Sequence, residues 1–267
     1  MSAPSGTQNP LDVRRLRAAL AGHAIGCEVE VHEELTSTSD RVRELGDAGH
    51  SHGLVVFAES QTAGRGRRDN RWSAMPRHDL LFSVLLRPRV GVEKSPRLAT
   101  LAALGLSRGV ESAGKFAPQI KWPNDLLLNR KKFCGILAEM FGAPAGSFLV
   151  LGVGMNVNGA EFPPEIAELA TSLRLESGGK LLDRTALAIA LLRALQQALD
   201  SWDAGFDRII AEVTRRSFLL GQRMRARAGS GMIEGVAHGL GGEGGLIVRR
   251  DDGTLLELTS AEEVRLA

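Results

Sequence analysis

Short connections between strand-like segments constrain the fold of this chain most. The apolar segments 120–129, 133–141 and 147–158 follow one another with only a few residues between them, and Pro-Asn-Asp at 123–125 divides the first into two short strands. Strands joined by such tight turns pair antiparallel, because a parallel pair needs a long crossover connection. The pattern therefore predicts an α+β fold, with a mixed or antiparallel sheet flanked by helices, rather than a doubly wound parallel sheet.

The remaining elements follow from the spacing of apolar residues and from capping residues. Further strands are expected where apolar residues alternate or form a short continuous run, at 27–33, 53–60 and 79–88. Helices are expected where the spacing is helical, at 11–21, from Ser37–Asp40 to about residue 48, and at 94–114, 163–170, 183–202 and 206–217.

The pattern changes at Gly221. From 222 to 267 the chain alternates in short strands around glycine and Asp-Asp-Gly turns, which is typical of a small, barrel-like all-β module. We therefore expect two domains, 1–219 and 220–267, with residues 1–10 disordered because they are small and polar.

Composition narrows the classes of function. The 33 Lys and Arg residues exceed the 31 Asp and Glu by two, and aromatic residues make up 4% with no Tyr, which disfavours a protein that stacks single-stranded nucleic acid. Cys27, Cys134 and the six histidines show no metal-ligand or CxxC spacing. The N-terminus does not look like a secretory signal, and no apolar run is long enough for a membrane span. We expect a reduced, cytoplasmic protein that does not bind membranes.

The basic segment 61–71, QTAGRGRRDNR, combines glycines with four arginines and one aspartate, for a charge of +3. Glycine lets the backbone approach a ligand closely, and guanidinium and N–H donors suit a phosphate or carboxylate. The spacing is not that of a P-loop. Taken alone, the segment is also compatible with a solvated loop or a nucleic-acid contact.

The segment KWPND, 121–125, has two interpretations. It is compatible with a hairpin turn beside a buried tryptophan, since Pro, Asn and Asp are common in turns. It is also compatible with a nucleotide site, in which Asn124 and Asp125 hold Mg²⁺ or a ribose and Lys121 lies beside a phosphate.

Two further segments contain glycine inside predicted strands or at their ends. KKFCG, 131–135, reads as a basic hairpin turn when taken alone, and Cys134 is more typical of a core position than of a nucleophile. In GVGMN, 152–156, two glycines weaken a strand unless something packs against its backbone. A bound ligand or a crossing helix would explain them.

Taken in order, these segments resemble the biotin–protein ligases. The resemblance spans about residues 35–265. It is carried by Ser37–Thr38, QTAGRGRR (61–68), RWSAMP (71–76), KWPNDLLL (121–128), KKFCGILAE (131–139) and GVGMNVN (152–158). It implies the catalytic fold of the biotin and lipoate ligases followed by an SH3-like β-barrel. It also implies that biotin and ATP, with Mg²⁺, form biotinyl-5′-AMP, and that biotin then passes to a lysine of a biotin carboxyl-carrier domain of a biotin-dependent carboxylase.

The resemblance implies site residues as well. Lys132, Arg65 and Arg67 would be catalytic, with both arginines ordering over the adenylate. Biotin would be bound by Ser37, Thr38, Ser39, Gln61, Gly64, Arg65, Gly66, Arg67, Lys132, Gly135, Leu137, Gly152 and Gly154. ATP would be bound by Arg67, Arg68, Lys121, Asn124, Asp125, Lys132, Asn156 and Arg265, and Asp125 would also face Mg²⁺. The chemistry agrees, because joining a carboxylate to an α-phosphate brings two anions together and cations must offset their repulsion.

This sequence differs from other members of the family in two features, one loop motif and the length of the chain before Ser37. Residues 75–79 read Met-Pro-Arg-His-Asp, with Asp79 where the family usually has Asn. Some members carry an N-terminal winged-helix repressor domain, but only 36 residues precede Ser37, too few for two DNA-reading helices and a wing. We expect the monofunctional type of ligase, without operator binding.

Three alternatives stay open at this point. A lipoate– or octanoate–protein ligase shares the fold, but its Arg-Arg and triple-glycine loop is absent while GRGRR and KWPND are present. A nucleic-acid module is disfavoured by the balanced charge. A non-catalytic homologue that binds biotin or the carrier would not need Arg65, Arg67 and Lys132. The oligomeric state is left open.

Overall fold

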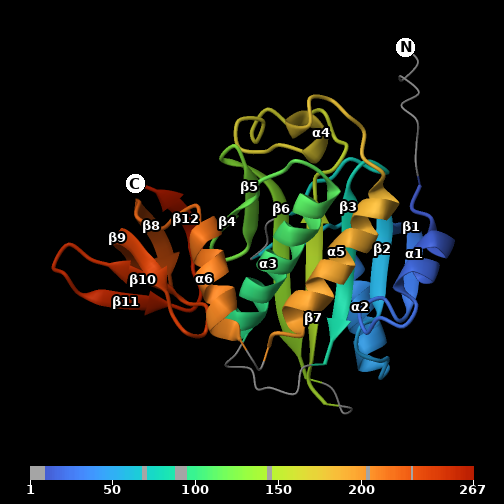
Figure 1. Ribbon diagram of the computed structural model, residues 1–267, viewed down its shortest axis with the longest axis horizontal. Helices are drawn as coiled ribbons and strands as arrows, with labels where there is room; N and C mark the ends of the chain where they lie inside the picture. The colour runs from blue at the N-terminus through green and yellow to red at the C-terminus, as the bar shows by residue number, and fades with distance from the viewer. Residues whose placement is uncertain (1–9, 68–70, 88–94, 143–145, 203–204, 230) are drawn as a thin grey trace.

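The computed structural model describes residues 10–67, 71–87, 95–142, 146–202, 205–229 and 231–267. Within these ranges the chain forms a main body of sheet and helices with a smaller sheet beside it (Figure 1). The helices are α1 (Val13–Leu20), α2 (Thr38–Asp47), α3 (Ser95–Ala113), α4 (Leu173–Glu176), α5 (Arg184–Leu199) and α6 (Phe206–Arg216). The strands are β1 (Val29–Leu35), β2 (Val55–Gln61), β3 (Leu80–Leu86), β4 (Gln119–Lys121), β5 (Asp125–Leu128), β6 (Lys131–Phe141), β7 (Phe148–Met155), β8 (Arg223–Ala228), β9 (Gly231–Leu240), β10 (Leu246–Arg249), β11 (Leu255–Leu258) and β12 (Glu262–Leu266).

The main sheet is mixed. Its described strands have the order β1-β2-β3-β7-β6-β5-β4, in which β1 and β2 are parallel and every other neighbouring pair is antiparallel. This confirms the predicted mixed sheet flanked by helices. The short turns between β4, β5, β6 and β7 join antiparallel neighbours, as their length requires. The glycine-bearing strand β7 lies at the centre, between β3 and β6.

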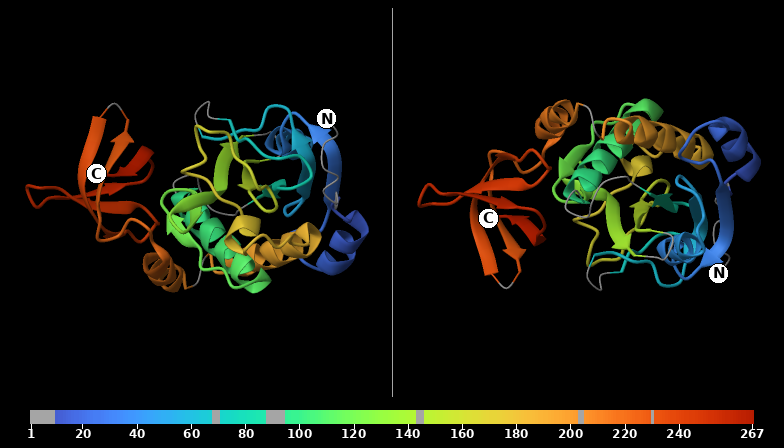
Figure 2. Two further views of the ribbon diagram at one scale, coloured as in Figure 1. Left: turned by 90° about the horizontal axis from the view of Figure 1, so that it is seen from above. Right: turned by 90° about the horizontal axis from the view of Figure 1, so that it is seen from below.

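Helices cover both faces of this sheet (Figures 1 and 2). Along β2, Val55 and Phe57 belong to the larger core, which includes α3 and α5, whereas Val56 belongs to a smaller core with Val42 and Leu45 of α2. Successive residues of a strand point to opposite faces, so a strand covered on both sides reads as a continuous apolar run. This explains the sequence of residues 53–60.

The C-terminal sheet has the order β11-β10-β9-β8-β12 in the described part of the chain, and all of its pairs are antiparallel. It lies beside α6, which contacts β9 (Figure 2). Its core includes Trp122 and Leu127 from the β4–β5 hairpin and Phe218 and Leu219 after α6. A sheet of this size buries little apolar surface by itself, and these side chains of the main body enlarge its core. We propose 219/220 as the domain boundary, three residues before Arg223 begins the sheet.

The helix predicted at 163–170 is wrong. The structure has successive turns there, closed by Ile166 N to Pro163 O (3.0 Å) and Leu169 N to Ile166 O (2.8 Å). Ile166 and Leu169 are 36% and 67% exposed, so a helix here would have no packed apolar face to stabilise it. The short helix α4, capped by Ser172, was not predicted. No helix among the described residues is long and apolar enough to cross a membrane.

Candidate functional site

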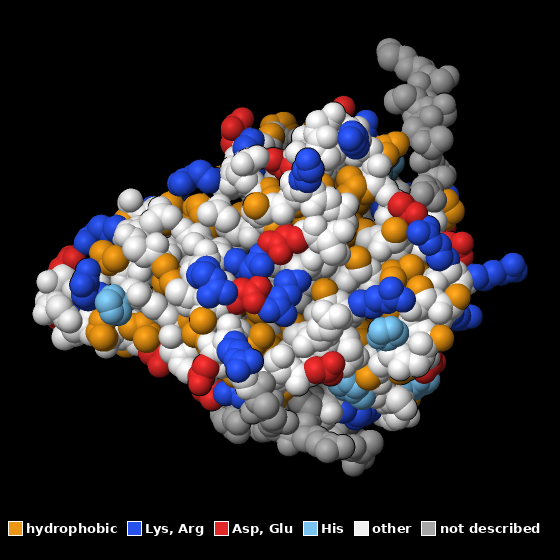
Figure 3. Space-filling view, viewed as in Figure 1, with side chains coloured by type: hydrophobic (Ala, Val, Ile, Leu, Met, Phe, Trp, Pro, Cys, Tyr) orange, Lys and Arg blue, Asp and Glu red, His pale blue; other side chains and the backbone are white. Residues whose placement is uncertain are grey.

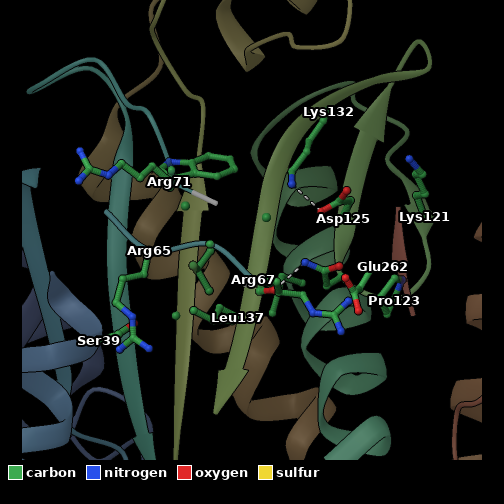
Figure 4. Close-up of a pocket in the computed structure, with 18 of the residues that line it drawn as sticks. Ser39, Arg65, Arg67, Arg71, Lys121, Pro123, Asp125, Lys132, Leu137 and Glu262 are labelled. Carbon is green, nitrogen blue, oxygen red and sulfur yellow. Dashed lines mark hydrogen bonds and ion pairs between the residues drawn. The ribbon is translucent and has the colours of Figure 1, made fainter. Parts of the chain in front are cut away.

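A cavity of about 760 Å³ lies beside the centre of the main sheet. The start of α2, the loop 61–67, the β4–β5 hairpin and the segment 261–265 contribute to its walls. Figure 4 shows Ser39 and Arg65 on one side of it and Lys121, Asp125, Lys132 and Glu262 on the other. Segments far apart in the sequence therefore meet at one pocket.

One end of the pocket carries a cluster of uncharged hydroxyl groups. Ser37 caps α2 by accepting a hydrogen bond from Ser39 N (3.2 Å). Gln61, at the end of β2, accepts from Thr38 N (2.7 Å), and the Thr38 and Ser39 hydroxyls each lie within 3.0 Å of the Ser83 hydroxyl. The three residues 37–39 are almost fully buried. This hydroxyl cluster can donate and accept hydrogen bonds without adding charge.

The two glycines of β7 lie where Ser39 and Trp72 pack against the backbone of the strand. A Cβ built on Gly152 would lie 2.7 Å from Ser39 Oγ, and one on Gly154 would lie 2.4 Å from the indole of Trp72. A Cβ on Gly135, opposite Gly154 in β6, would lie 2.9 Å from the same indole. The glycines thus let the start of α2 and the Trp72 ring approach the strand backbone.

The opposite end of the pocket is cationic. Lys132 Nζ lies 2.7 Å from Asp125 Oδ1 and 5.4 Å from the centre of the Trp72 ring. Burial lowers the pKa of Lys121, Asp125 opposes this shift, and the positive charges of Lys132 and Arg265 add to it. Over the whole described lining of the pocket, six Lys and Arg side chains face three carboxylates, Asp125, Glu262 and Glu263. This leaves an excess of positive charge to attract anionic ligand groups.

The arginines of the glycine-rich loop bind different parts of the chain. Arg67 Nη1 donates to Ala261 O (2.8 Å), so the loop contacts the C-terminal part of the chain. Arg65 forms ion pairs with Asp40 (2.8 Å) and Glu139, on the side of the pocket away from Lys132 (Figure 4). Arg68, also expected to bind ATP, lies outside the described residues.

Most of the predicted site residues line the pocket, and two do not. Asn156 is buried behind it, where its Nδ2 donates to Thr171 O (3.0 Å). Gly64 is also buried and accepts from Trp72 N (3.0 Å) through its carbonyl oxygen. Those that line the cavity are Ser37, Thr38, Ser39, Gln61, Arg65, Gly66, Arg67, Lys121, Asn124, Asp125, Lys132, Gly135, Leu137, Gly152, Gly154 and Arg265.

The structure confirms the hairpin interpretation of KWPND, and the nucleotide site stays a prediction. Trp122 is 7% exposed and donates from Nε1 to Gly244 O (3.1 Å), as expected of a buried tryptophan beside a hairpin. Lys121, Asn124 and Asp125 nevertheless line the pocket. The Asn124 Nδ2 donates to Ile136 O (3.0 Å), which fixes the turn against β6.

The predicted site lacked several residues that the structure places at the pocket, among them Arg71, Glu262 and Glu263. Ser83 and Trp72 matter most for its shape. Ser83 joins the hydroxyl cluster, and the signal was a lone serine inside the apolar strand LLFSVLL. Trp72 forms one wall, and its motif RWSAMP contributes to the resemblance without a predicted role for the tryptophan. The indole ring could not be placed from sequence, because its contacts with Gly135 and Gly154 join three separate segments.

Cys134 is fully buried in β6, and burial raises the pKa of its thiol well above the usual range. A thiol held in this way does not supply a thiolate nucleophile at neutral pH. Among the described residues, no group of three or more His, Cys, Asp or Glu side chains is placed to hold a metal ion. The described lining of the pocket contains hydroxyl groups, amides, Lys and Arg side chains.

Comparisons with known proteins point to one family. The sequence model described as "Biotin/lipoate A/B protein ligase family" matches residues 31–156. The biotin–[acetyl-CoA-carboxylase] ligase of Mycobacterium tuberculosis is 35% identical over 262 residues, which cover 96% of this chain and 95% of the relative. The bifunctional ligase/repressor BirA of Bacillus subtilis (strain 168) is 33% identical over 247 residues, which cover 91% of this chain and 76% of the relative.

Similarity to solved structures extends over most of the chain. A biotin protein ligase from Aquifex aeolicus, solved in complex with biotin and ATP, has a TM-score of 0.80 and 30% sequence identity. The match covers 90% of this chain and 99% of that chain. The likeness therefore includes the elements that surround the pocket and not only the short motifs.

Proposed function

The chain belongs to the biotin/lipoate A/B protein ligase family and, within it, to the biotin–protein ligases, and we propose that its pocket makes biotinyl-5′-AMP and transfers biotin to a carrier lysine. One observation carries this proposal. The pocket has an uncharged hydroxyl cluster at one end and an excess of cations at the other. Biotin has matching ends, a neutral ureido ring and a carboxylate.

The ring system is proposed to bind at the hydroxyl end. Ser37, Thr38, Ser39 and Gln61 offer donors and acceptors for the ureido N–H and C=O groups. The apolar part of the ring is proposed to lie against the wall that Trp72 and Leu137 form, next to Gly152 and Gly154 of β7. Burial of these groups favours one bound orientation, because an unpaired polar group would cost about 1–3 kcal/mol.

The first step joins two anions. An oxygen of the biotin carboxylate attacks the α-phosphorus of ATP, and pyrophosphate leaves with the electron pair of the broken P–O bond. We propose that Lys132 meets the carboxylate and the α-phosphate, giving up its ion pair with Asp125 (2.7 Å) when the ligands arrive. Arg67, Lys121 and Arg265 add positive charge around the nucleotide, which lowers the repulsion between the reactants.

Mg²⁺ is proposed to arrive with the phosphates of ATP. The protein offers no ready-made cage of three acidic or histidine side chains within the described residues. Mg²⁺ usually keeps its waters and takes one or two carboxylates together with substrate phosphates, and Asp125 at the pocket fits that arrangement. The ion would supply charge neutralisation for the phosphates.

The second step needs no enzyme nucleophile. The neutral amine of the acceptor lysine attacks the carbonyl carbon of biotinyl-5′-AMP, an amide bond forms, and AMP leaves. The burial of Cys134 agrees with direct transfer. As the name of the Mycobacterium tuberculosis relative suggests, we propose a carrier domain of an acetyl-CoA carboxylase as the acceptor.

The test is pyrophosphate release by the purified protein with Mg-ATP and one acid at a time. We expect release with biotin, and little with lipoate or octanoate, because the neutral hydroxyl cluster is matched to the ureido ring. Release with lipoate but not with biotin would contradict the proposal and favour a lipoate–protein ligase.

A further inference from the structure

A buried carboxylate fastens one wall of the pocket to the end of the central strand. Asp79 directly precedes β3 and is 4% exposed. Its Oδ2 accepts a hydrogen bond from Met75 N (2.8 Å), and its Oδ1 accepts one from Val157 N (2.9 Å). The N–H of Gly159 also bonds the carboxylate. The side chain is thus surrounded by backbone donors.

These donors belong to two separate segments. Met75 lies in the segment 72–79, which runs from the pocket to the start of β3, whereas Val157 and Gly159 follow the end of β7. In the same place the carbonyl oxygen of His78 accepts from Asn158 N (3.0 Å). The carboxylate of Asp79 therefore holds the segment 72–79 against the chain that leaves β7.

A buried ion pair, Arg184 with Glu59, lies beside Asp79 and fixes the same part of the chain. Arg184, at the start of α5, is 1% exposed and donates from Nη1 to the carbonyl oxygen of Asp79 (2.9 Å). Its Nη2 lies 2.8 Å from Oε2 of the buried Glu59. The carbonyl oxygen of Glu59 in turn accepts from Arg77 N (3.0 Å). Buried charges are tolerated when such bonds compensate their desolvation, so this corner has one well-defined arrangement.

The other end of the segment reaches the pocket. Trp72 lines the cavity, and its indole lies against Gly135 and Gly154. The indole N–H is buried and has no hydrogen-bond partner in the part of the chain that the structure describes. Buried donors normally have a partner, so a ligand acceptor is expected to bond this N–H when the pocket is filled. The placement of Trp72 therefore matters for binding.

We propose that Asp79 is a positioning residue of the site: by fastening Met75 to the end of β7, it keeps the Trp72 indole seated over Gly135 and Gly154 and so sets the affinity of the pocket for its ligand. That the ligand is biotin rests on the proposed function. The placement of Trp72 does not depend on the ligand, so the two ideas can fail separately.

The substitution Asp79→Asn tests the fastening with almost no change of shape. An amide has one acceptor oxygen and one NH₂ group, so it cannot serve donors on both sides. Val157 N bonds Oδ1, and a Cβ built on Gly159 would lie nearer Oδ1 (3.4 Å) than Oδ2 (3.8 Å). The amide oxygen is therefore expected on that side, with its NH₂ facing the N–H of Met75. This variant releases Met75, and Asp79→Ala releases both sides.

The first experiment follows Trp72 without any ligand. In protein labelled with 5-fluorotryptophan, ¹⁹F NMR resolves Trp72, Trp122 and Trp202, and the Trp72 signal is assigned with Trp72→Phe. We expect Asp79→Asn to shift or broaden the Trp72 signal and to leave the other two in place. The matched control is Asn158→Asp, which exchanges an amide and a carboxylate at a buried neighbour whose side chain bonds Leu182 instead.

The second experiment measures biotin affinity by calorimetry, at a temperature at which all variants are folded. Loss of a hydrogen bond to a charged group predicts about tenfold weaker binding for Asp79→Asn. Asn158→Asp keeps the bonds of Asp79 to Met75 and Val157, so its biotin affinity is expected to stay within about twofold of the parent. An unchanged Trp72 signal in Asp79→Asn overturns the proposal. A shifted signal with unchanged biotin affinity also overturns it.

Failure of the parent protein to bind biotin would contradict the proposed function, and the link to affinity would fall with it. The ¹⁹F result would still decide whether Asp79 places Trp72. If neither Asp79 variant folds, hydrogen exchange in the unsubstituted protein decides the same point. We expect the Met75 amide to exchange slowly because it bonds a buried carboxylate. Exchange as fast as that of a free amide would overturn the proposal.

Discussion

Lys132 is the residue on which the first reaction step depends most directly. Its ammonium group is partly exposed, lies 2.7 Å from Asp125 and stands at the cationic end of the pocket. A compact charge on a flexible stem can leave one anion and follow another, which suits a group that meets the carboxylate and the α-phosphate in turn. This proposed role can be tested against its neighbour in the sequence.

We predict that Lys132→Ala lowers biotin-dependent pyrophosphate release by about a hundredfold, because a preorganised cation at the reacting groups is lost. The control is Lys131→Ala, which removes the adjacent ammonium group. Lys131 contacts Ala167 O and lies near Glu168, outside the pocket lining. A near-normal rate in Lys132→Ala would count against its role.

Asp79 gives a prediction for pH dependence. Burial raises the pKa of this carboxyl above its ordinary value of 3.8, although backbone hydrogen bonds and the nearby His78 oppose the shift. Arg184 and Glu59 meet at the same corner. The native state thus binds the proton more tightly than the unfolded chain. The resulting contribution to stability is fully present below about pH 3.8 and is lost as the pH rises through the native pKa.

Protonation of Asp79 places an O–H where an acceptor is needed. Biotin affinity is therefore expected to fall as the pH drops through the raised native pKa, without a loss of stability from this group. Calorimetric titrations of the parent protein should show this change and those of Asp79→Asn should lack it, while His78→Gln should keep it. The same pH profile in the parent and in Asp79→Asn would contradict the assignment.

At the residue scale, motifs predicted most of the pocket lining, because GRGRR, KWPND and KKFCG each carry several of its residues in one short run. The misses have physical causes. Ser83 lies on a strand whose apolar sequence predicts a buried position but does not predict a binding role for the serine. Asn156 follows the pocket strand β7, but its side chain turns to Thr171. Side-chain direction at a strand end depends on the segments that pack there.

At the scale of elements, the strand β7 lies at the centre of the main sheet and also lines the pocket. Its seven paired positions with β3, and its eight with β6, place Gly152 and Gly154 beside α2 and Trp72. The apolar run predicted this strand and the glycines predicted a close contact, although not its partner. The error at 163–170 arose because helical spacing alone does not tell whether a surface is available for the apolar face, as the exposed Leu169 shows.

We predict that Gly154→Ala weakens biotin binding about tenfold or more, because the new methyl group would lie 2.4 Å from the Trp72 indole and displace it. Gly239→Ala is the control, since a Cβ at this position of β9 meets no atom within 4 Å. Calorimetry with biotin is the measurement. Equal affinity in Gly154→Ala and the parent would show that the contact does not shape the site.

At the scale of the whole molecule, the C-terminal sheet closes one side of the pocket. Arg67 and Ala261 are 194 residues apart and joined by a hydrogen bond. The register shift between Glu262 and Arg265 in β12, with Glu263 at a φ of 48°, lies beside this contact. Sequence predicted the module but not its place, because contacts between distant segments leave no periodic pattern. On the face shown in Figure 3, acidic and basic side chains are interspersed, in line with the balanced charge.

We predict that Arg67→Gly shortens the lifetime of enzyme-bound biotinyl-5′-AMP several-fold. The loop 61–67 loses its hydrogen bond to Ala261, so water reaches the adenylate and the adenylate dissociates more easily. Arg223→Gly is the control, an arginine of the C-terminal sheet paired with Asp251 outside the pocket lining. The lifetime is measured by trapping released adenylate. An unchanged lifetime in Arg67→Gly would argue against the anchor.

The central claim is that this chain transfers biotin to a carrier lysine, and the mass of the carrier tests it most directly. The protein is mixed with Mg-ATP, biotin and the carrier domain of an acetyl-CoA carboxylase, beside a carrier whose acceptor lysine is replaced by arginine. We predict a gain of one biotinyl group on the intact carrier and none on the substituted one, with no gain from lipoate or octanoate. No gain with biotin, together with no pyrophosphate release, would contradict the account.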